Sequence, residues 1–379
     1  MSRPVLVTGL GLVSCAGEGI EAHLAALEAG AAPRTDTQTF APYCVHPAPS
    51  IAWDGQIPKR SDQRQMEAWQ RLGVYAAGLA LDSAGVKGDA ALKQALHLVV
   101  AAGGGERDYA VDGAILTGLR DAADPGAYLN ERLQNDLRPT LFLAQLSNLL
   151  AGNIAIVHGV TGASRTFMGE EAAGVDALRI AQARVAAGQI DAILVGGSYS
   201  AERPDVLVVH EMGGYLARAP YQPVFERGTR IDAPAGFILG SCAAFLMLES
   251  EAHAAARGAQ ALARLDRVAS DRAPRIPGSV AHSLDVLWAQ AGLASPDRVL
   301  SGASGVAPIT AEEQDAIARL APGADVRALG DVIGHGLEIV APFGAALAAG
   351  LVAAGSAREV AVTTVGHRRG EGVLRLTQA

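Results

Sequence analysis

Short apolar runs rich in β-branched residues alternate with Ala-rich segments of helical spacing, and this alternation limits the fold more than any other feature of the sequence. Two Ala-rich segments, 173–188 and 343–355, each end at a glycine that can cap a helix. Apolar runs of this length are typical of buried strands. We therefore predict a layered α/β fold with strands at 5–9, 96–103, 190–197, 243–249, 298–304 and 359–366.

The two halves of the chain resemble each other weakly. Each half has a Gly-containing turn that leads into an Ala-rich helix and then a buried strand near its end. No linker rich in Ser, Pro or Gly divides the 379 residues, so we expect one compact unit. The irregular stretch 31–61 is rich in Pro, Thr and Asp and is expected to be a surface loop.

Charge and apolar content exclude several classes of function. The 31 Lys and Arg residues are outnumbered by 39 Asp and Glu, and the formal net charge of −8 argues against a nucleic-acid-binding face. No run reaches the roughly 18–20 apolar residues of a membrane span, because the most apolar tract, 341–354, is short and contains Pro342. The N-terminus lacks a signal-peptide pattern, so we expect a cytoplasmic protein without a membrane span.

Cysteine spacing argues against a disulfide framework and against a structural metal. Cys15, Cys44 and Cys242 are scattered, and none forms a CxxC pair or lies at a zinc-finger spacing from a histidine. We expect neither disulfides nor a bound metal.

Six segments, in order along the chain, resemble signatures of the β-ketoacyl synthase family. They are VLVTGLGLVSCAGEG from Val5, LSNLLAGNIAIVHGVTG from Leu146, GQIDAILVGG from Gly188, GFILGSCAAFLMLESEAHAAARGA from Gly236, DVIGHGLEIVAPFG from Asp331 and VTTVGHRRGEG from Val362. The resemblance runs from the first predicted strand to the last. It implies a thiolase-like fold, in which two pseudo-repeated αβαβα halves form five layers. The halves would be residues 1–250, with loop insertions, and residues 251–379.

The positions that carry catalysis in active members of that family differ in this chain. Counting back from GQIDAILVGG without a gap puts Glu171 where active members have the nucleophilic cysteine. The position of the first histidine of active members corresponds to Ser301 or Gly302 here. Active members also have a lysine five residues before the Gly-His pair, and Gly330 stands at that position. The second histidine is retained as His335. The resemblance thus implies that no intact catalytic set is present.

The closing loop differs as well. The family's Phe-containing, glycine-rich pattern is replaced by Gly366, His367, Arg368 and Arg369. The aromatic gate that the resemblance would imply is therefore absent from this chain.

Glu171 and His335 can form an ion pair if the family geometry places both in one pocket, and the two side chains would then titrate as one coupled unit. A carboxylate substitutes poorly for a thiolate, because it would form a labile anhydride. Two simpler interpretations stay open. Glu171 can be a helix-start carboxylate stabilised by the helix dipole, and His335 can be a packing histidine beside tight glycines.

Family members without the thiol include the chain-length factor, which pairs with an active ketosynthase as a pseudo-symmetric heterodimer. The resemblance implies this role here, with acyl chains carried on the phosphopantetheine of an acyl carrier protein and no cofactor in this chain. Residues 108–137 would shape the acyl tunnel. The strand that pairs across the two-fold axis would comprise Ala163, Ser164, Arg165, Thr166, Phe167 and Met168.

Subunits of this kind act in type II polyketide systems that make aromatic polyketides or conjugated polyenes. Some relatives have glutamine at the cysteine position, where a neutral amide accompanies decarboxylation of a malonyl group. The glutamate at position 171 departs from that pattern and favours an aryl polyene system.

The alternative is a stand-alone acyl-processing enzyme. Glu171 and His335 would then serve a malonyl decarboxylase or an acyltransferase, and Glu171 would have to be protonated or paired, because an ionised carboxylate repels a malonyl carboxylate. Ser164 or Thr166 as a nucleophile would need a nearby base, and no Ser-His-Asp or GxSxG arrangement is present. A dinucleotide site at the glycines from Gly9 is rejected, because the required acidic residue after a second strand is missing.

Overall fold

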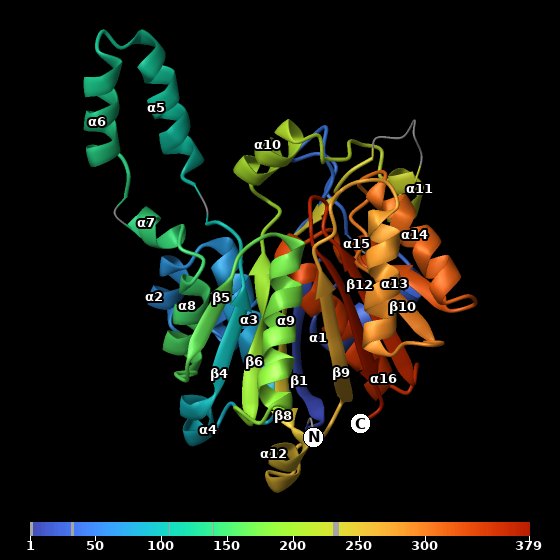
Figure 1. The fold of residues 1–379 in the computed structure, drawn as a ribbon. Helices are drawn as coiled ribbons and strands as arrows, with labels where there is room; N and C mark the ends of the chain where they lie inside the picture. The colour runs from blue at the N-terminus through green and yellow to red at the C-terminus, as the bar shows by residue number, and fades with distance from the viewer. Residues whose placement is uncertain (1–2, 32–33, 106, 139, 230–234) are drawn as a thin grey trace.

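Ten of the thirteen described strands form two groups of five within one large sheet, and β3 and β7 form a separate two-stranded sheet (Figure 1). The computed structural model describes residues 3–31, 34–105, 107–138, 140–229 and 235–379. The first group comprises β1 (Val5–Ser14), β4 (His97–Ala101), β5 (Ser164–Phe167), β6 (Ala192–Tyr199) and β8 (Cys242–Ser250). The second comprises β9 (Ala263–Asp271), β10 (Arg298–Ser301), β11 (Asp325–Ala328), β12 (Glu359–Val365) and β13 (Glu371–Thr377). The short β2 (Gly17–Glu18) pairs with β1.

Both groups have the same topology. The order is β5-β4-β6-β8-β1 in the first group and β11-β10-β12-β13-β9 in the second. β8 in the first group and β13 in the second are antiparallel to both of their neighbours, and the other pairs within each group are parallel. Antiparallel pairing of Leu6 with Arg264 and of Val7 with Ala263 joins β1 to β9. The pseudo-repeat predicted from the sequence is confirmed.

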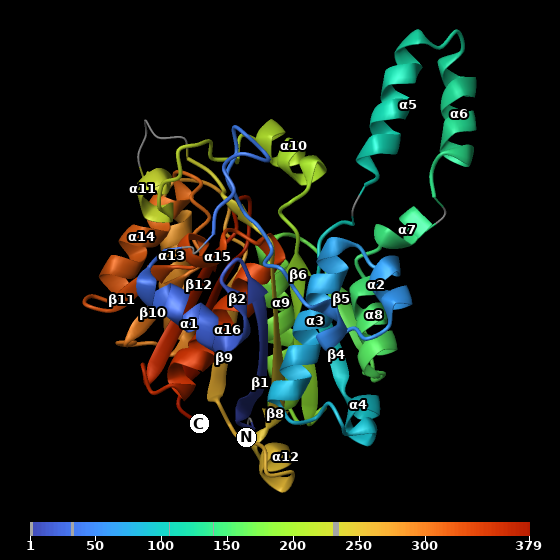
Figure 2. The same cartoon turned by 180° about the vertical axis from the view of Figure 1, so that it is seen from behind.

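Three layers of helices accompany the two groups of strands, which gives five layers in all. α3 (Ala68–Ser83) and α8 (Leu149–His158) pack on the outer face of the first group. α13 (Ser279–Ala291) and α14 (Ile309–Leu320) cover the outer face of the second. α9 (Glu171–Ala186) and α16 (Val340–Ala353) pack against each other and contact strands of both groups, so they form the central layer (Figure 1 and Figure 2). This is the thiolase-like arrangement that the sequence predicts.

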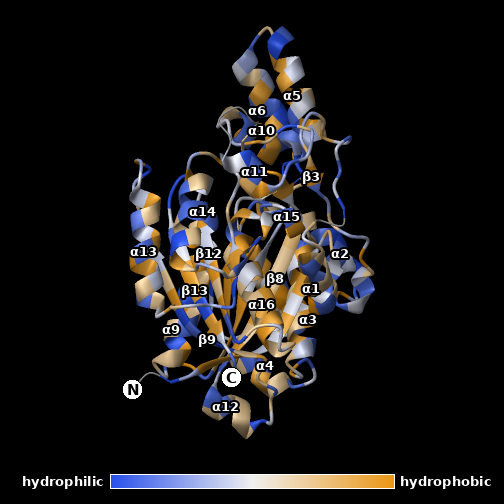
Figure 3. Ribbon diagram, turned by 90° about the vertical axis from the view of Figure 1, so that its right-hand side faces the viewer, coloured by the Kyte–Doolittle hydropathy of each residue, from blue (hydrophilic) through white to orange (hydrophobic). Residues whose placement is uncertain are grey.

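The central layer explains why two helices are so rich in alanine and glycine. A helix between two groups of strands has no solvent-facing side, and small side chains let the backbones approach closely. Every residue of α16 from Val340 to Val352 is buried. Figure 3 shows this helix among hydrophobic segments in the interior of the molecule, with hydrophilic residues gathered on outer helices such as α2 (Arg60–Gln65), whereas α12 (Glu251–Ala256) is of mixed character.

The remaining elements are short or lie at the periphery. α5 (Tyr109–Asp121) and α6 (Pro125–Asn135) form a hairpin that projects from the body of the protein, with α7 (Thr140–Ala144) at its base (Figure 1). The others are α1 (Gly19–Ala29), β3 (Val45–His46), η1 (Trp53–Gly55), α2 (Arg60–Gln65), α4 (Ala90–Ala95), α10 (Pro204–Met212), α11 (Val224–Thr229), β7 (Leu239–Gly240), α15 (Gly330–Ile333) and η2 (Leu337–Ile339).

The predicted elements are all present, and some further strands are not evident from the sequence. The six apolar runs form β1, β4, β6, β8, β10 and β12, and the two Ala-rich segments lie in α9 and α16. β9 lacks a clear apolar signal, because the charged residues Arg264 and Asp266 alternate with its buried residues. In the part of the chain that the structure describes, no helix is both long and apolar enough to cross a membrane.

The expectation that 31–61 is a surface loop is wrong for part of that stretch. Cys44, Val45 and His46 are buried, and β3 pairs in parallel with β7. Ile57 is also buried and packs in the core cluster around α3. These residues form no periodic run, so their burial depends on contacts with distant parts of the chain.

Candidate functional site

A tight turn between the edge strand and the central helix positions Glu171. After β5, Gly169 has φ 132°, and Glu170 has φ 62° and ψ −148°. The backbone of a residue with a side chain rarely adopts such a conformation, which costs on the order of 1–3 kcal/mol. The turn places Glu171 at the first residue of α9, with its side chain 0% exposed.

His335 lies directly opposite the Glu171 carboxyl. It follows α15 and Gly334, whose φ of 75° favours glycine. The backbone N–H of His335 donates to the carbonyl of Ile238 at 2.8 Å, and its carbonyl accepts from the N–H of Gly240 at 3.1 Å. The ring of Phe237 stacks on the imidazole, with 4.6 Å between ring centroids. These contacts fix the imidazole and point it toward Glu171.

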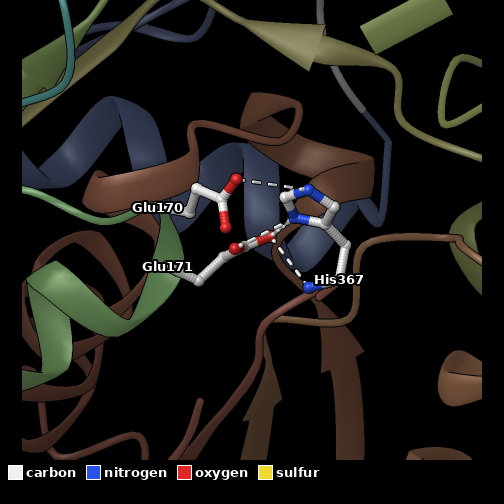
Figure 4. Close-up of side chains that lie close together, drawn as sticks. All are labelled: Glu170, Glu171 and His367. Carbon is white, nitrogen blue, oxygen red and sulfur yellow. Dashed lines mark hydrogen bonds and ion pairs between the residues drawn. The ribbon is translucent and has the colours of Figure 1, made fainter. Parts of the chain in front are cut away.

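Three polar side chains converge at the start of α9, and two of them are histidines. Nε2 of His335 donates to Oε1 of Glu171 at 2.8 Å. From the closing loop, Nδ1 of His367 donates to the same oxygen at 3.0 Å, and its backbone N–H donates to it at 3.3 Å (Figure 4). The structure therefore brings Glu171 and His335 together and adds His367 to them.

The Glu171 carboxyl is ionised in this environment. Burial alone would raise its pKa, but the hydrogen bonds from His335 and His367 stabilise the anion and hold the pKa of Glu171 well below its usual range. An ionised carboxylate accepts hydrogen bonds and cannot donate them. Glu171 can thus orient the two imidazoles, but it cannot serve as a general acid.

Glu170 lies on the outer side of the cluster. Its Oε1 is 3.7 Å from Nε2 of His367 and 3.4 Å from Nη1 of Arg368. One ligand atom from each of Glu170, Glu171 and His367 lies within 4.8 Å of the others, which is close enough for a divalent cation (Figure 4). A cation there would have to replace the existing contacts between His367 and the carboxylates.

Three other positions singled out in the sequence have different surroundings. Ser301 donates its hydroxyl to the buried carboxyl of Glu313 at 2.8 Å. Gly302 has no room for a side chain, because an added Cβ would lie 2.5 Å from Cγ1 of Val340. Gly330 begins α15 beside Val224. A histidine at position 302 would therefore not fit without repacking.

The cysteines and the two edge-strand hydroxyls considered from the sequence are not set up as substitute nucleophiles. All three cysteines are buried, and burial raises the pKa of Cys15 to about 11 and also raises the pKa values of Cys44 and Cys242. In the described part of the chain, the hydroxyls of Ser164 and Thr166 make no hydrogen bond to a histidine. The alternative of acyl transfer by these hydroxyls gains no support.

The edge of the sheet carries the six residues predicted to pair across a two-fold axis. β5 pairs with β4 on one side only and ends the strand order. A groove of about 670 Å³ runs between β5 and α9 and is lined by residues that include Ser164, Arg165 and Arg184. Large apolar side chains are also exposed near this edge: Ile156 of α8, a helix that contacts β5, is 74% exposed, and Met168, which follows β5, is 63% exposed.

Several residues of the site have no signal in the sequence. His367 is marked only by its place in the closing loop, and nothing local indicates that it reaches Glu171. The rings of Tyr215 and Phe237 lie 4.7 Å and 4.9 Å from His367, so they enclose the imidazole. Phe237 belongs to the quoted segment that begins at Gly236, but the motif does not say that it stacks on His335.

Comparison with known families and curated proteins identifies related sequences. A family model described as "Beta-ketoacyl synthase, N-terminal domain" matches residues 2–254. The chain is 26% identical over 279 residues to the 3-oxoacyl-(acyl-carrier-protein) synthase 2 of Vibrio cholerae, a match that covers 69% of this chain but only 62% of that protein. It is 27% identical over 386 residues to the tetracenomycin polyketide synthase ketoacyl synthase beta subunit of Streptomyces glaucescens, covering 96% and 86% of the two chains.

Solved structures with the same fold cover the whole chain. The structure described as "The ishigamide ketosynthase/chain length factor" superposes with a TM-score of 0.80 at 20% identity, and a β-ketoacyl synthase from Burkholderia phymatum superposes with a TM-score of 0.81 at 18% identity. In both cases all of each chain is covered. At these identities the likeness shows the fold alone.

Proposed function

This chain belongs to the β-ketoacyl synthase family, and from that premise we propose that it is a chain-length factor, the non-condensing partner of an active ketosynthase in a type II polyketide system. One observation carries the proposal. At the start of the central helix, where active members would have the thiol, Glu171 is buried and hydrogen-bonded to two histidines. The likeness to a ketoacyl synthase beta subunit supports it.

The chemistry of Glu171 argues against condensation by this chain. Condensation through a covalent acyl-enzyme needs a thiolate with a free lone pair beside the thioester carbonyl. The Oε1 atom of Glu171 accepts from both His335 and His367, and its acyl derivative would be a labile anhydride. This chain would therefore have a structural carboxylate where an active subunit has its nucleophile. Condensation falls to the partner subunit.

The open edge at β5 is the proposed pairing surface. The carbonyls of Ala163 and Phe167 accept hydrogen bonds from Leu98 and Ala102 on the β4 side. Because backbone groups alternate in direction along a strand, those of Ser164 and Thr166 point toward the open side. An unpaired edge next to exposed apolar side chains invites pairing with another chain. We propose that the equivalent strand of the ketosynthase continues the sheet here and forms a heterodimer.

The α5–α6 hairpin is the proposed contribution to the acyl tunnel. It covers most of the stretch 108–137, stands clear of the body (Figure 1), and exposes Leu116, Leu129 and Leu133. In α5, the buried residue is Ile115. A hairpin that packs so little of its apolar surface against its own chain is suited to pack against a partner. Its large side chains would then limit how many two-carbon units the tunnel accepts.

The finer parts of the proposal follow from the family. Acyl chains would reach the complex on the phosphopantetheine of an acyl carrier protein, and this chain would hold no cofactor of its own. The glutamate at position 171 in place of glutamine favours an aryl polyene system over an aromatic one. We place the complex in the cytoplasm.

Co-expression tests the pairing. The chain is produced alone and together with a thiol-containing ketosynthase of the same genome, and both samples are analysed by native mass spectrometry. A one-to-one complex of the two subunits is expected. A homodimer of this chain that persists unchanged in the presence of every such ketosynthase would contradict the proposal.

A further inference from the structure

A cavity of about 250 Å³ lies at the carboxyl ends of β4 and β6. Its walls are the glycine segment 103–105, the end of β6 at 198–200, residues of α10, and Glu338 on η2. Glu171, His335 and His367 do not line it, although His210 does, and the His210 ring lies 6.0 Å from that of His367. In open α/β sheets, ligands bind beyond the carboxyl ends of parallel strands. The cavity is thus a neighbour of the site described above and separate from it.

Two buried polar groups of this cavity lack partners. The hydroxyl of Tyr199 and Oε2 of Glu338 make no hydrogen bond to any described residue. The two residues are only 7% and 4% exposed. Unsatisfied buried polar groups are uncommon in folded proteins and call for an explanation. A ligand with complementary donor and acceptor atoms provides one.

The backbone around Glu338 holds its carboxyl in the cavity. The preceding residue, Leu337, has φ 47°, a left-handed conformation that is rare for leucine and occurs mainly where the surroundings enforce it. Across the cavity, a Cβ added to Gly103 would lie 2.9 Å from Oε1 of Glu338. A side chain at position 103 would therefore collide with the Glu338 carboxyl, and glycine avoids that collision.

The charged groups of the cavity determine what kind of ligand it suits. Arg203 is already engaged by the Asp205 carboxylate at 2.6 Å and by the carbonyls of Gly104 and Gly105 at 3.3 Å and 2.5 Å. Burial lowers the pKa of His210 to about 4, so its ring is neutral. Burial also raises the pKa of Glu338 to about 7, so near neutral pH its carboxyl is partly protonated and both donates and accepts hydrogen bonds. An anionic ligand would face two carboxyl groups, whereas a neutral one would not be repelled.

We propose that this cavity binds a small neutral molecule with a carboxamide group. The carboxamide N–H donates to the carboxyl of Glu338, and the carboxamide oxygen accepts from the hydroxyl of Tyr199 or from the protonated carboxyl. A planar amide matches a carboxyl group in this way, because each presents a donor and an acceptor side by side. This binding site is independent of the proposed pairing with a ketosynthase.

Propionamide serves as the probe, with the full-length chain titrated and binding followed by saturation-transfer NMR. We expect saturable binding that the Tyr199→Phe variant weakens about fivefold or more, as the loss of one neutral hydrogen bond does. Tyr128→Phe, on the projecting hairpin, is the matched control and should bind like the wild type. Propionate, which has nearly the same shape but a negative charge, should bind far more weakly. Equal binding of propionamide to wild type and Tyr199→Phe, or equal binding of propionate and propionamide, would overturn the proposal.

Thermal unfolding without the probe gives a second test that does not depend on affinity. If the Tyr199 hydroxyl has no partner in the protein, Tyr199→Phe leaves the melting temperature unchanged or raises it, because an unpaired buried hydroxyl has been removed. A clear fall in melting temperature would mean that the hydroxyl has a structural partner, and the proposal would then be wrong.

Discussion

Nε2 of His335 donates a 2.8 Å hydrogen bond to Oε1 of Glu171, across 164 residues of sequence and between two side chains that are almost completely buried. This bond joins the start of the central helix to the loop after α15. With the second bond from His367, it links distant segments at the residue that we propose stands in place of the nucleophile. We therefore expect this carboxylate to act in stability rather than in acyl transfer.

Removing the Glu171 carboxylate should destabilise the protein without preventing assembly. Glu171→Ala leaves two buried imidazoles without their acceptor, and breaking a buried ionic pair from one side costs about 3–5 kcal/mol. We expect a loss of unfolding free energy of about that size in urea titrations, because two buried N–H donors lose their acceptor. Glu170→Gln, at the partly exposed neighbour, should cost less than about 1 kcal/mol. A variant at position 171 as stable as the wild type would contradict the structural role.

Restoring a thiol should not restore condensation. In Glu171→Cys the sulfur would lie at the start of α9, but in the proposed alignment Ser301 or Gly302 stands where active members have the first histidine, and Gly302 has no room for one. We expect acyl transfer from an acyl carrier protein to the new cysteine at most, seen as a mass increase of the intact chain, and no elongated product. Elongation by this single variant would show that the remaining residues suffice for catalysis.

Stability should fall as the pH rises through neutrality, in part because of Glu313. Burial raises the pKa of Glu313 from 4.5 to about 7, although the hydroxyls of Ser301 and Thr363 donate to it. The folded state therefore prefers the protonated form. The stability linked to this group is complete below about pH 4.5 and is lost as the pH rises through about 7.

Urea titrations at several pH values between those limits measure this effect. The unfolding free energy of the wild type should decline more steeply with pH than that of Glu313→Gln, which keeps an oxygen for both hydroxyls. Some slope should remain in the variant, because burial also raises the pKa of Glu338 to about 7. Identical slopes for the two proteins would rule out the assigned role of Glu313.

A proline in the edge strand should prevent assembly with the ketosynthase. The N–H of Thr166 points toward the open side of β5, so Thr166→Pro removes a donor that the partner strand would need. Thr166→Val keeps the N–H and suits a strand equally well. Size-exclusion chromatography of the co-expressed subunits should show the complex with valine and separate subunits with proline. Equal assembly of both variants would place the interface elsewhere.

Much of the architecture can be predicted from the sequence because its strands and central helices are buried on all sides. β6 and β8 read as unbroken apolar runs, and α16 reads as a helix of small residues. β13 and β9 escape detection, because charged residues such as Arg375 and Arg267 interrupt their apolar residues. β13 is almost entirely buried all the same, so an unbroken apolar run, rather than burial itself, decides which strands the pattern reveals.

The site is only partly predictable for a different reason. Glu171 and His335 can be located because each lies at a fixed distance from a recognisable motif. The contact of His367 with Glu171, and the pocket that holds Tyr199 and Glu338, arise where segments far apart in the sequence meet. No local pattern marks such contacts.

An elongation assay tests the central claim most directly. This chain, a thiol-containing ketosynthase of the same genome, and the mixture of the two are each incubated with malonyl and acyl groups on acyl carrier protein, and the products are identified by mass spectrometry. The account predicts extended chains from the mixture, and none from this chain alone. Turnover of acyl substrate by this chain alone, at a rate that the ketosynthase does not change, would contradict it and would make Glu171 and His335 a working catalytic pair.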